Sequence, residues 1–417
     1  MNKLKTLIKN LGPGLLFASM AIGTSHLVLS TKAGATYGWV MVFPILLANL
    51  LKYPFFEYGI RYTNVTGRSL IEGYSRRGKG YMWVYAVITL FTTFTILAAL
   101  YVVTAGLLAN LFKITTLSVS GIALGLFLFI SSVLIIGRYK LLETTLKFVI
   151  TILFVALLVT TLMVLYKPPA TVVEGFETPP LFDSVGILFL ISLIGWMPTA
   201  VEASSWISLW SLEKYKSQGR KPPLKDALQE FNTGYITTAL LAVFFLLIGY
   251  RTLFGTQTEL SGEAVTFADQ VVSIFTTHIG DWAYLFIAVS AFATMFSTCM
   301  TAHDAIARVS VDVLEYLRPD KKRFTKKKHY AAAVIVLTLV NYMVLSAFSA
   351  NMGTLVALAT FISFVLAPLV GYMNLKNVCS KDLPVEYHPG PGLRLLTYMG
   401  IVFLSFFSVY YLWMILV

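Results

Sequence analysis

The sequence is poor in charged residues and in cysteine. Asp, Glu, Lys and Arg together make up 12% of its 417 residues, whereas soluble globular chains carry roughly 25%. This scarcity excludes an ordinary soluble domain and indicates an integral membrane protein. The two cysteines, Cys299 and Cys379, lie far apart in the sequence and form no paired metal-ligand motif.

Motifs of common enzyme classes are also missing. The sequence contains no HExxH zinc motif, no Gly-x-Ser-x-Gly nucleophile turn and no Walker-type phosphate loop. We therefore expect no catalytic residues and no cofactor. The net charge of +12 would suggest nucleic acid in a soluble protein. Here the basic residues lie in loops between apolar runs, so we expect them to set membrane topology and predict no nucleic-acid partner.

The apolar residues form runs close to the ~20 residues that a helix needs to cross a bilayer. Runs of this length favour an all-α protein over a β-barrel, whose strands alternate over about 10 residues. The expected spans, eleven in number, are 12–31, 38–60, 82–109, 115–136, 144–166, 185–209, 230–254, 281–307, 329–348, 352–375 and 392–416. They form a single transmembrane domain over residues 1–417, and the basic N-terminus runs into the first span without a cleavage site.

Lys and Arg concentrate at the N-terminus and in the loops that follow the even-numbered spans. The positive-inside rule then places the N-terminus in the cytoplasm and the C-terminus outside, in the plasma (inner) membrane. The expected partners are the lipid bilayer and a small inorganic ion. The sequence does not indicate an oligomeric state.

Two spans are interrupted by residues that a continuous helix would not select. The first span contains GTSH at 23–26, and the sixth contains GWMPT at 195–199. Broken helices in corresponding places indicate the substrate site of a transporter near the membrane centre. They also predict two five-helix units of opposite orientation, 1–166 and 185–375, followed by an extra helix at 392–417.

Motifs spread over the whole chain resemble the Nramp family of metal transporters. They are Gly12-Pro13, AGATYG at 33–38, ANL at 48–50 with Arg61 and Val65-Thr66-Gly67, GRY at 137–139 with Glu143 and Lys147, and Met197-Pro198. The resemblance implies the same eleven helices, a LeuT-like 5+5 inverted repeat, and a substrate site between broken helices 1 and 6.

The sequence departs from the Nramp pattern at the positions that handle metal and protons. The family carries Asp-Pro-Gly-Asn at the helix 1 break, where Asp and Asn bind the metal, and residues 23–26 here contain no carboxylate. The family's Met-Pro-His in helix 6 ends in Thr199, and span 82–109 has no acidic residue. Asn232 matches the Asp that begins helix 7, and Thr360 matches the Gln of helix 10.

The missing carboxylate disfavours a hard divalent cation, which needs oxygen ligands with negative charge. An anion suits the breaks better, because the second half-helices begin there with free N–H groups and positive dipole ends. The residues predicted to bind substrate are Gly23, Thr24, Ser25, His26, Met197, Pro198 and Thr199. The sequence resembles Nramp-related bacterial bicarbonate transporters that lack the metal-binding pair, so bicarbonate is the expected substrate.

Alternatives remain open for the substrate and for single residues. His26 and Met197 can form a soft site, so a divalent metal transporter (Mn²⁺, Fe²⁺ or Mg²⁺) is one alternative, and a transport-inactive sensor is another. The hydroxyls of Thr24 and Ser25 can instead bond the backbone of a kinked helix. His26 can form an interhelical hydrogen bond, and Met197 can fill a packing gap.

Coupling to Na⁺ or H⁺ is expected, and several polar residues inside the spans are candidates for it. Glu202 can relay a proton, bind a cation or pair with another helix, and Lys52 can attract an anion or pair with Glu202. Ser297 and Thr298 can hold Na⁺ together with the carbonyl end of a half-helix. The matched positions Asn232 and Thr360 complete the coupling candidates.

Overall fold

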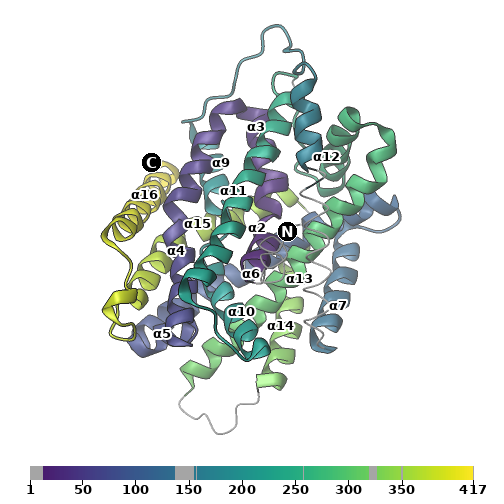
Figure 1. Cartoon of the computed structure of the whole chain (residues 1–417). Helices are drawn as coiled ribbons and strands as arrows, with labels where there is room; N and C mark the ends of the chain where they lie inside the picture. Colours follow the sequence, from purple (N-terminus) through teal and green to yellow (C-terminus); the bar gives the residue numbers. More distant parts are fainter. Residues whose placement is uncertain are drawn as a thin grey trace, which may run out of the picture.

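The computed structural model describes residues 13–136, 155, 157–256, 258–318, 326–348 and 351–416, and this part of the chain is helical (Figure 1). Eight of its helices are long and apolar enough to cross a membrane, and three more are apolar but shorter. Large apolar side chains such as Phe43, Leu285 and Val402 are exposed on the outward faces. Lipid is the natural environment for such faces, which confirms a multi-pass membrane protein.

The helices follow the predicted spans closely. In chain order they are α2 (Pro13–Ala21), the π-helix η1 (Ser25–Ser30), α3 (Thr31–Tyr37), η2 (Gly38–Met41), α4 (Val42–Thr66), α5 (Leu70–Arg77), α6 (Lys79–Phe112), α7 (Val119–Ile136), α9 (Ser184–Gly195), α10 (Ala203–Gln218), α11 (Leu224–Leu253), α12 (Ala264–Ile279), η3 (Asp281–Ala283), α13 (Tyr284–Leu317), α14 (Lys326–Ala347), α15 (Met352–Val378), η4 (Val385–Tyr387) and α16 (Pro391–Leu416). Of the expected span 144–166, only residues 155 and 157–166 are described, and both Gly12 and the motif at 137–147 lie outside the described residues.

Both predicted interruptions occur, and small residues explain their packing. Helix 1 stops at Ala21 and resumes at Ser25. A Cβ added to Gly23 would lie 2.9 Å from Cγ2 of Thr298, so the missing side chain lets the break pack directly against α13. In the same way, a Cβ on Gly195 would lie 2.4 Å from the carbonyl oxygen of Thr360, which brings the end of α9 onto α15.

The second interruption is longer than the sequence pattern predicts. The predicted break ends at Thr199, but α10 begins only at Ala203. Pro198 has no N–H to continue the helix, and the backbone stays irregular through Glu202. Glu202 therefore lies in the break itself and not one helical turn beyond it.

Two amphipathic helices occupy segments that were expected to be loops. The segment 255–280 contains α12, whose first amides bond to the carboxylate of Glu263. The segment after α4 contains α5, where the Ser69 hydroxyl accepts a hydrogen bond from the amide of Glu72. These N-caps start helices too short or too polar to be recognised as spans. The two helices lie at opposite ends of the bundle (Figure 1).

Candidate functional site

A small cavity of about 20 Å³ lies between the two breaks. Its walls come from helix 1, α6, the α9–α10 break, α10 and α13. The lining residues are Met20, Ala21, Thr24, Ser25, Ile96, Leu100, Trp196, Thr199, Ala200, Trp206, Thr298 and Ala302. A cavity of this size has room for about one water molecule, so the site is closed around its centre.

Four cavity-lining residues have backbone amides that make no backbone hydrogen bond among the described residues. They are Thr24 and Ser25 at the first break and Thr199 and Ala200 at the second. Amides at the start of a helix are unpaired by geometry, and the helix dipole makes this end partly positive. The cavity therefore has hydrogen-bond donors on both of its broken helices.

The hydroxyl groups connect the two breaks. The Ser25 hydroxyl oxygen lies 2.8 Å from Nδ1 of His26, 2.9 Å from the carbonyl oxygen of Ala21 and 3.3 Å from that of Pro198, and its single proton can serve one of these acceptors at a time. The Thr24 hydroxyl points to the sulfur of Met295 on α13, 3.9 Å away. Ser25 thus joins helix 1 to helix 6 at the level of the cavity.

His26 and Met197 do not line the cavity, although both are fully buried. The Nε2 atom of His26 lies 2.9 Å from the carbonyl oxygen of Thr238 on α11. A carbonyl only accepts, so Nε2 carries a proton and Nδ1 faces the Ser25 hydroxyl at 2.8 Å. Within the described part of the chain, no group of three His, Cys, Asp or Glu side chains is placed to hold a metal ion.

Hydroxyls of α13 surround the carbonyl end of α2. The Thr298 hydroxyl oxygen lies 3.1 Å from the carbonyl oxygen of Ser19 and 3.0 Å from that of Thr294, and the hydroxyl oxygens of Ser19 and Ser297 are 3.4 Å apart. Carbonyl and hydroxyl oxygens together are suitable ligands for a small cation. The structure therefore brings the predicted candidates Ser297 and Thr298 to the end of the first half-helix.

Lys52 is buried at the other carbonyl end. Its Nζ atom lies 3.0 Å from the carbonyl oxygen of Ile194, 2.8 Å from that of Gly195 and 3.0 Å from that of Thr199. The side chain extends from α4, and the residue is only 1% exposed. Lys52 therefore closes the end of α9 and does not extend to the membrane surface.

Glu202, in the second break, is also buried. Both of its carboxylate oxygens lack a hydrogen-bond partner among the described residues. Its charge interacts with that of Lys52, but the described ion pairs within 4 Å do not include these two groups. The second break therefore has two buried charged groups beside it: the Lys52 ammonium from α4, whose three donors are used, and its own Glu202 carboxylate, whose oxygens have no partner among the described residues.

The two remaining predicted candidates lie away from the cavity. Asn232 accepts a hydrogen bond from Tyr53 at 2.8 Å, and the Thr360 hydroxyl donates to the carbonyl of Val356 within α15. Sequence reasoning missed the two tryptophans that line the cavity, Trp196 and Trp206. Trp196 lies inside the GWMPT motif, so its position beside a break was the available signal.

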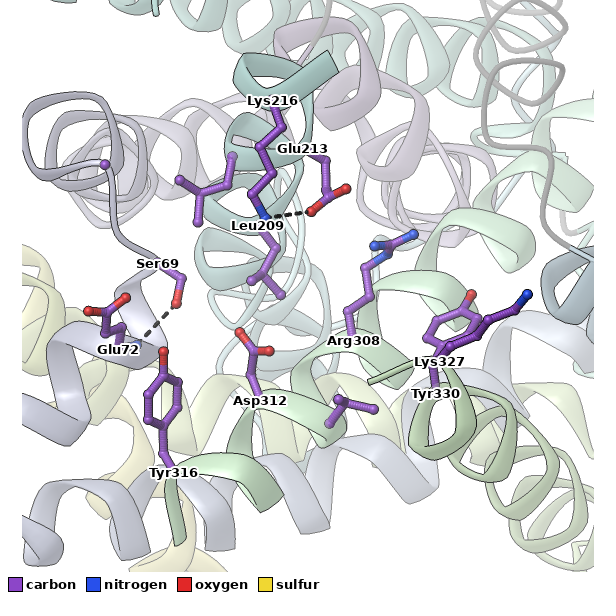
Figure 2. Close-up of a pocket in the computed structure, with 13 residues that line it drawn as sticks. Ser69, Glu72, Leu209, Glu213, Lys216, Arg308, Asp312, Tyr316, Lys327 and Tyr330 are labelled. Carbon is purple, nitrogen blue, oxygen red and sulfur yellow. Dashed lines mark hydrogen bonds and ion pairs between the residues drawn. The ribbon is translucent and has the colours of Figure 1, made fainter. Parts of the chain in front are cut away.

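Larger cavities lie on either side of the central one. A cavity of about 430 Å³ lies at the α5 end, lined by residues of α5, α10, α13 and α14 (Figure 2). A cavity of about 180 Å³ at the α12 end is lined by residues that include Lys32, Ser192 and Phe267. Asp304 on α13 binds Arg308 at 2.8 Å and Tyr330 of α14 at 2.7 Å, which ties these two helices together beside the larger cavity.

An ion-pair cluster outside the spans ties α5 to the segment after α15. Asp382 lies 2.9 Å from Arg76, 3.5 Å from Arg77 and 3.7 Å from Arg68. Burial alone would raise the pKa of Asp382, but the hydrogen bond and charge of Arg76 and the charge of Arg77 outweigh it, so the pKa is lowered. Within α4, Arg61 also forms an ion pair with Glu57 one helical turn earlier, at 2.5 Å.

Comparison with known proteins identifies relatives over almost the whole chain. Residues 14–414 match the family described as natural resistance-associated macrophage protein-like, Nramp. An uncharacterized protein of Pasteurella multocida is 31% identical over 410 residues, which cover 96% of this chain and 91% of the relative.

Solved transporters share the fold at low sequence identity. A manganese transporter of Eremococcus coleocola superposes with a TM-score of 0.69 at 12% identity, over 97% of this chain and 86% of that one. A nucleobase-cation-symport-1 family transporter gives 0.63 at 13% identity, over 97% and 92%. The LeuT-like, all-helical membrane fold predicted from the sequence is confirmed.

Proposed function

The chain belongs to the Nramp family of secondary transporters, and from this premise we propose that it transports a small inorganic anion, bicarbonate, by alternating access coupled to a cation. The observation that supports this proposal is the central cavity, which has unpaired amides on both broken helices and no carboxylate in its lining. Donors without a counter-anion favour a ligand that is negatively charged and rich in acceptors.

Bicarbonate fits this donor set in chemistry and in size class. It is small and planar, and its three oxygens accept hydrogen bonds from amides and from the hydroxyls of Thr24, Ser25 and Thr199. The cavity must widen to admit it, because the present volume matches about one water. The cavities of about 430 and 180 Å³ on either side supply the routes that alternating access requires.

We assign the coupling cation to Na⁺ at the carbonyl end of α2. The supporting observation is the group of oxygens from Ser19, Ser297 and Thr298. A cation there would offset the negative end of the α2 dipole beside the anion. A proton carried by Glu202 or His26 is the competing coupling mode, and the sodium dependence of flux separates the two.

The positive-inside pattern supports a cytoplasmic position for the α5 end in this proposal. Arg76 and Arg77 belong to α5, and Lys214 and Lys216 belong to the last part of α10, which lines the same cavity as α5. The cavity of about 430 Å³ is then the cytoplasmic one. The protein is expected in the plasma (inner) membrane with its C-terminus outside.

A flux assay in proteoliposomes tests the proposal. Vesicles holding a pH-sensitive dye receive an inward bicarbonate gradient with and without a sodium gradient, and parallel vesicles receive Mn²⁺ with a metal-sensitive dye. We expect protein-dependent alkalinisation of the interior that sodium accelerates, and no manganese signal. Manganese uptake without bicarbonate flux would establish the metal-transporter alternative, and ligand binding without any flux would establish the sensor.

A further inference from the structure

An anion between the breaks lies close to the carbonyl ends of two half-helices as well as to the two amide ends. Carbonyls at a helix C-terminus lack helical partners and carry partial negative charge. The ends of α2 and α9 would therefore repel the anion that the amides attract. An anion site at this place needs positive charge at both carbonyl ends.

Lys52 places an ammonium group at the carbonyl end of α9, on a covalently attached side chain. An ammonium group has three N–H donors, and the three carbonyls of Ile194, Gly195 and Thr199 lie within 3.0 Å of Nζ. All three donors are satisfied, which is the geometry of the charged form. Thr199 also lines the cavity, so a single residue separates the ammonium from the substrate position.

The carbonyl end of α2 has a different arrangement. The carbonyl oxygens of Ser19 and Ala21 face the hydroxyls of Thr298 and Ser25, which are neutral. No Lys or Arg side chain donates to these carbonyls among the described hydrogen bonds. One half-helix therefore has a covalently tethered cation, and the other has only oxygen ligands.

Glu202 lies in the second break and its charge opposes that of Lys52, which extends to this break from α4. Its carboxylate is 4% exposed, makes no hydrogen bond among the described residues, and interacts with the charge of Lys52. A negative charge there weakens the positive field that reaches the cavity.

We propose that Lys52 is the residue that makes this site select an anion, because it neutralises the carbonyl end of α9, and that Glu202 sets how strongly it does so. This inference rests on the proposed anion transport. Lys52 acts through Thr199 and the end of α9, so it is a positioning and specificity residue and not a direct ligand.

The test is a double-mutant cycle that removes the charges of Lys52 and Glu202 singly and together, with bicarbonate flux measured in proteoliposomes. Lys52→Met keeps the length of the side chain and should raise KM for bicarbonate about 30-fold, the upper range for a charge at a partly buried helix end. Glu202→Gln should lower KM several-fold, and the double variant should return toward the wild-type KM. Lys52→Arg keeps the charge and should change KM least.

A remote pair serves as a control for charge removal. Lys214 and Glu230 form an ion pair at 2.9 Å between α10 and α11, and Lys214→Met with Glu230→Gln should leave KM for bicarbonate unchanged. If Lys52 has a purely structural role, the KM for bicarbonate should rise equally in Lys52→Met and in the double variant. That result would overturn the inference.

The remaining outcomes are also decisive. A fall in kcat without a change in KM for Lys52→Met would refute the electrostatic role. Where Lys52→Met does not fold, an unchanged KM in Glu202→Gln alone refutes it. Absence of bicarbonate flux in the wild-type protein overturns the proposed function and this inference together, whereas wild-type flux with an unchanged KM in Lys52→Met overturns the inference alone.

Discussion

Gly23 offers the sharpest test of the charge at the helix 1 break. Replacing it with Asp introduces the residue type that the resemblance to the Nramp pattern predicts for metal-transporting members at this position. The change has two separate effects. A new Cβ meets Cγ2 of Thr298 at 2.9 Å, and the carboxylate adds negative charge beside the unpaired amides of Thr24 and Ser25.

The size of each effect can be estimated separately. Overpacking a tight contact costs about 1–3 kcal/mol of stability, and Gly23→Ala incurs the same contact without the charge. Two like charges about 6 Å apart at an effective dielectric constant of about 20 repel by about 3 kcal/mol. The carboxylate should therefore weaken bicarbonate binding roughly 100-fold beyond the effect of Gly23→Ala.

The assay compares bicarbonate KM for the wild type, Gly23→Ala and Gly23→Asp in proteoliposomes, with thermal unfolding in detergent to confirm that each variant folds. We expect a small change for Ala and a large one for Asp. Equal KM values for the two variants would refute the reasoning, because the added charge would then have no effect on the substrate.

Three further predictions follow from single contacts. Thr298→Val removes a hydroxyl at the α2 end, so the sodium concentration for half-maximal flux should rise about 10-fold; a shift in bicarbonate KM at saturating sodium instead would contradict the sodium assignment. His26→Ala removes the hydrogen bond to the Thr238 carbonyl and leaves a cavity in the buried packing, so it should cost about 1–3 kcal/mol of stability, measured by thermal unfolding, with little change in bicarbonate KM in the protein that folds. The lowered pKa of Asp382 stabilises the fold above the ordinary carboxyl range, and this contribution is lost as pH falls through the lowered pKa. The difference in unfolding temperature between the wild type and Asp382→Asn should therefore shrink on acidification. A difference that stays constant down to acid pH would show that the ion pair of Asp382 with Arg76 does not contribute to stability.

The sequence predicted the parts of the fold that depend on local composition. Apolar length predicted the spans, and Gly23, Gly195 and Pro198 predicted the breaks, because missing side chains and a missing N–H act where they occur. The extent of the second break was not predictable in this way. The carbonyls of Gly195 and Thr199 in this break accept hydrogen bonds from Lys52, which comes from a different helix.

The role of each candidate residue depends on partners far away in the sequence. His26 lies 212 positions from Thr238, and this contact keeps its ring outside the cavity. Trp206 lines the cavity because α10 packs beside α2, α4 and α13. Motif spacing contains no information about such contacts. The sequence pattern therefore identified the two breaks, but the residues that line the cavity could be identified only from the structure. The division into two inverted five-helix units stays a prediction.

The small central cavity has a consequence for hydration. A space of about 20 Å³ leaves no room for a solvated ion, so an entering anion must release its water shell and recover the lost hydrogen bonds from the protein. The available replacements are the four amides and the hydroxyls of the two breaks. Selectivity among anions will then depend on the free energy of dehydrating each anion and on the number of its acceptor atoms that these donors can reach. Anions of equal charge will therefore be discriminated by their shape and hydration.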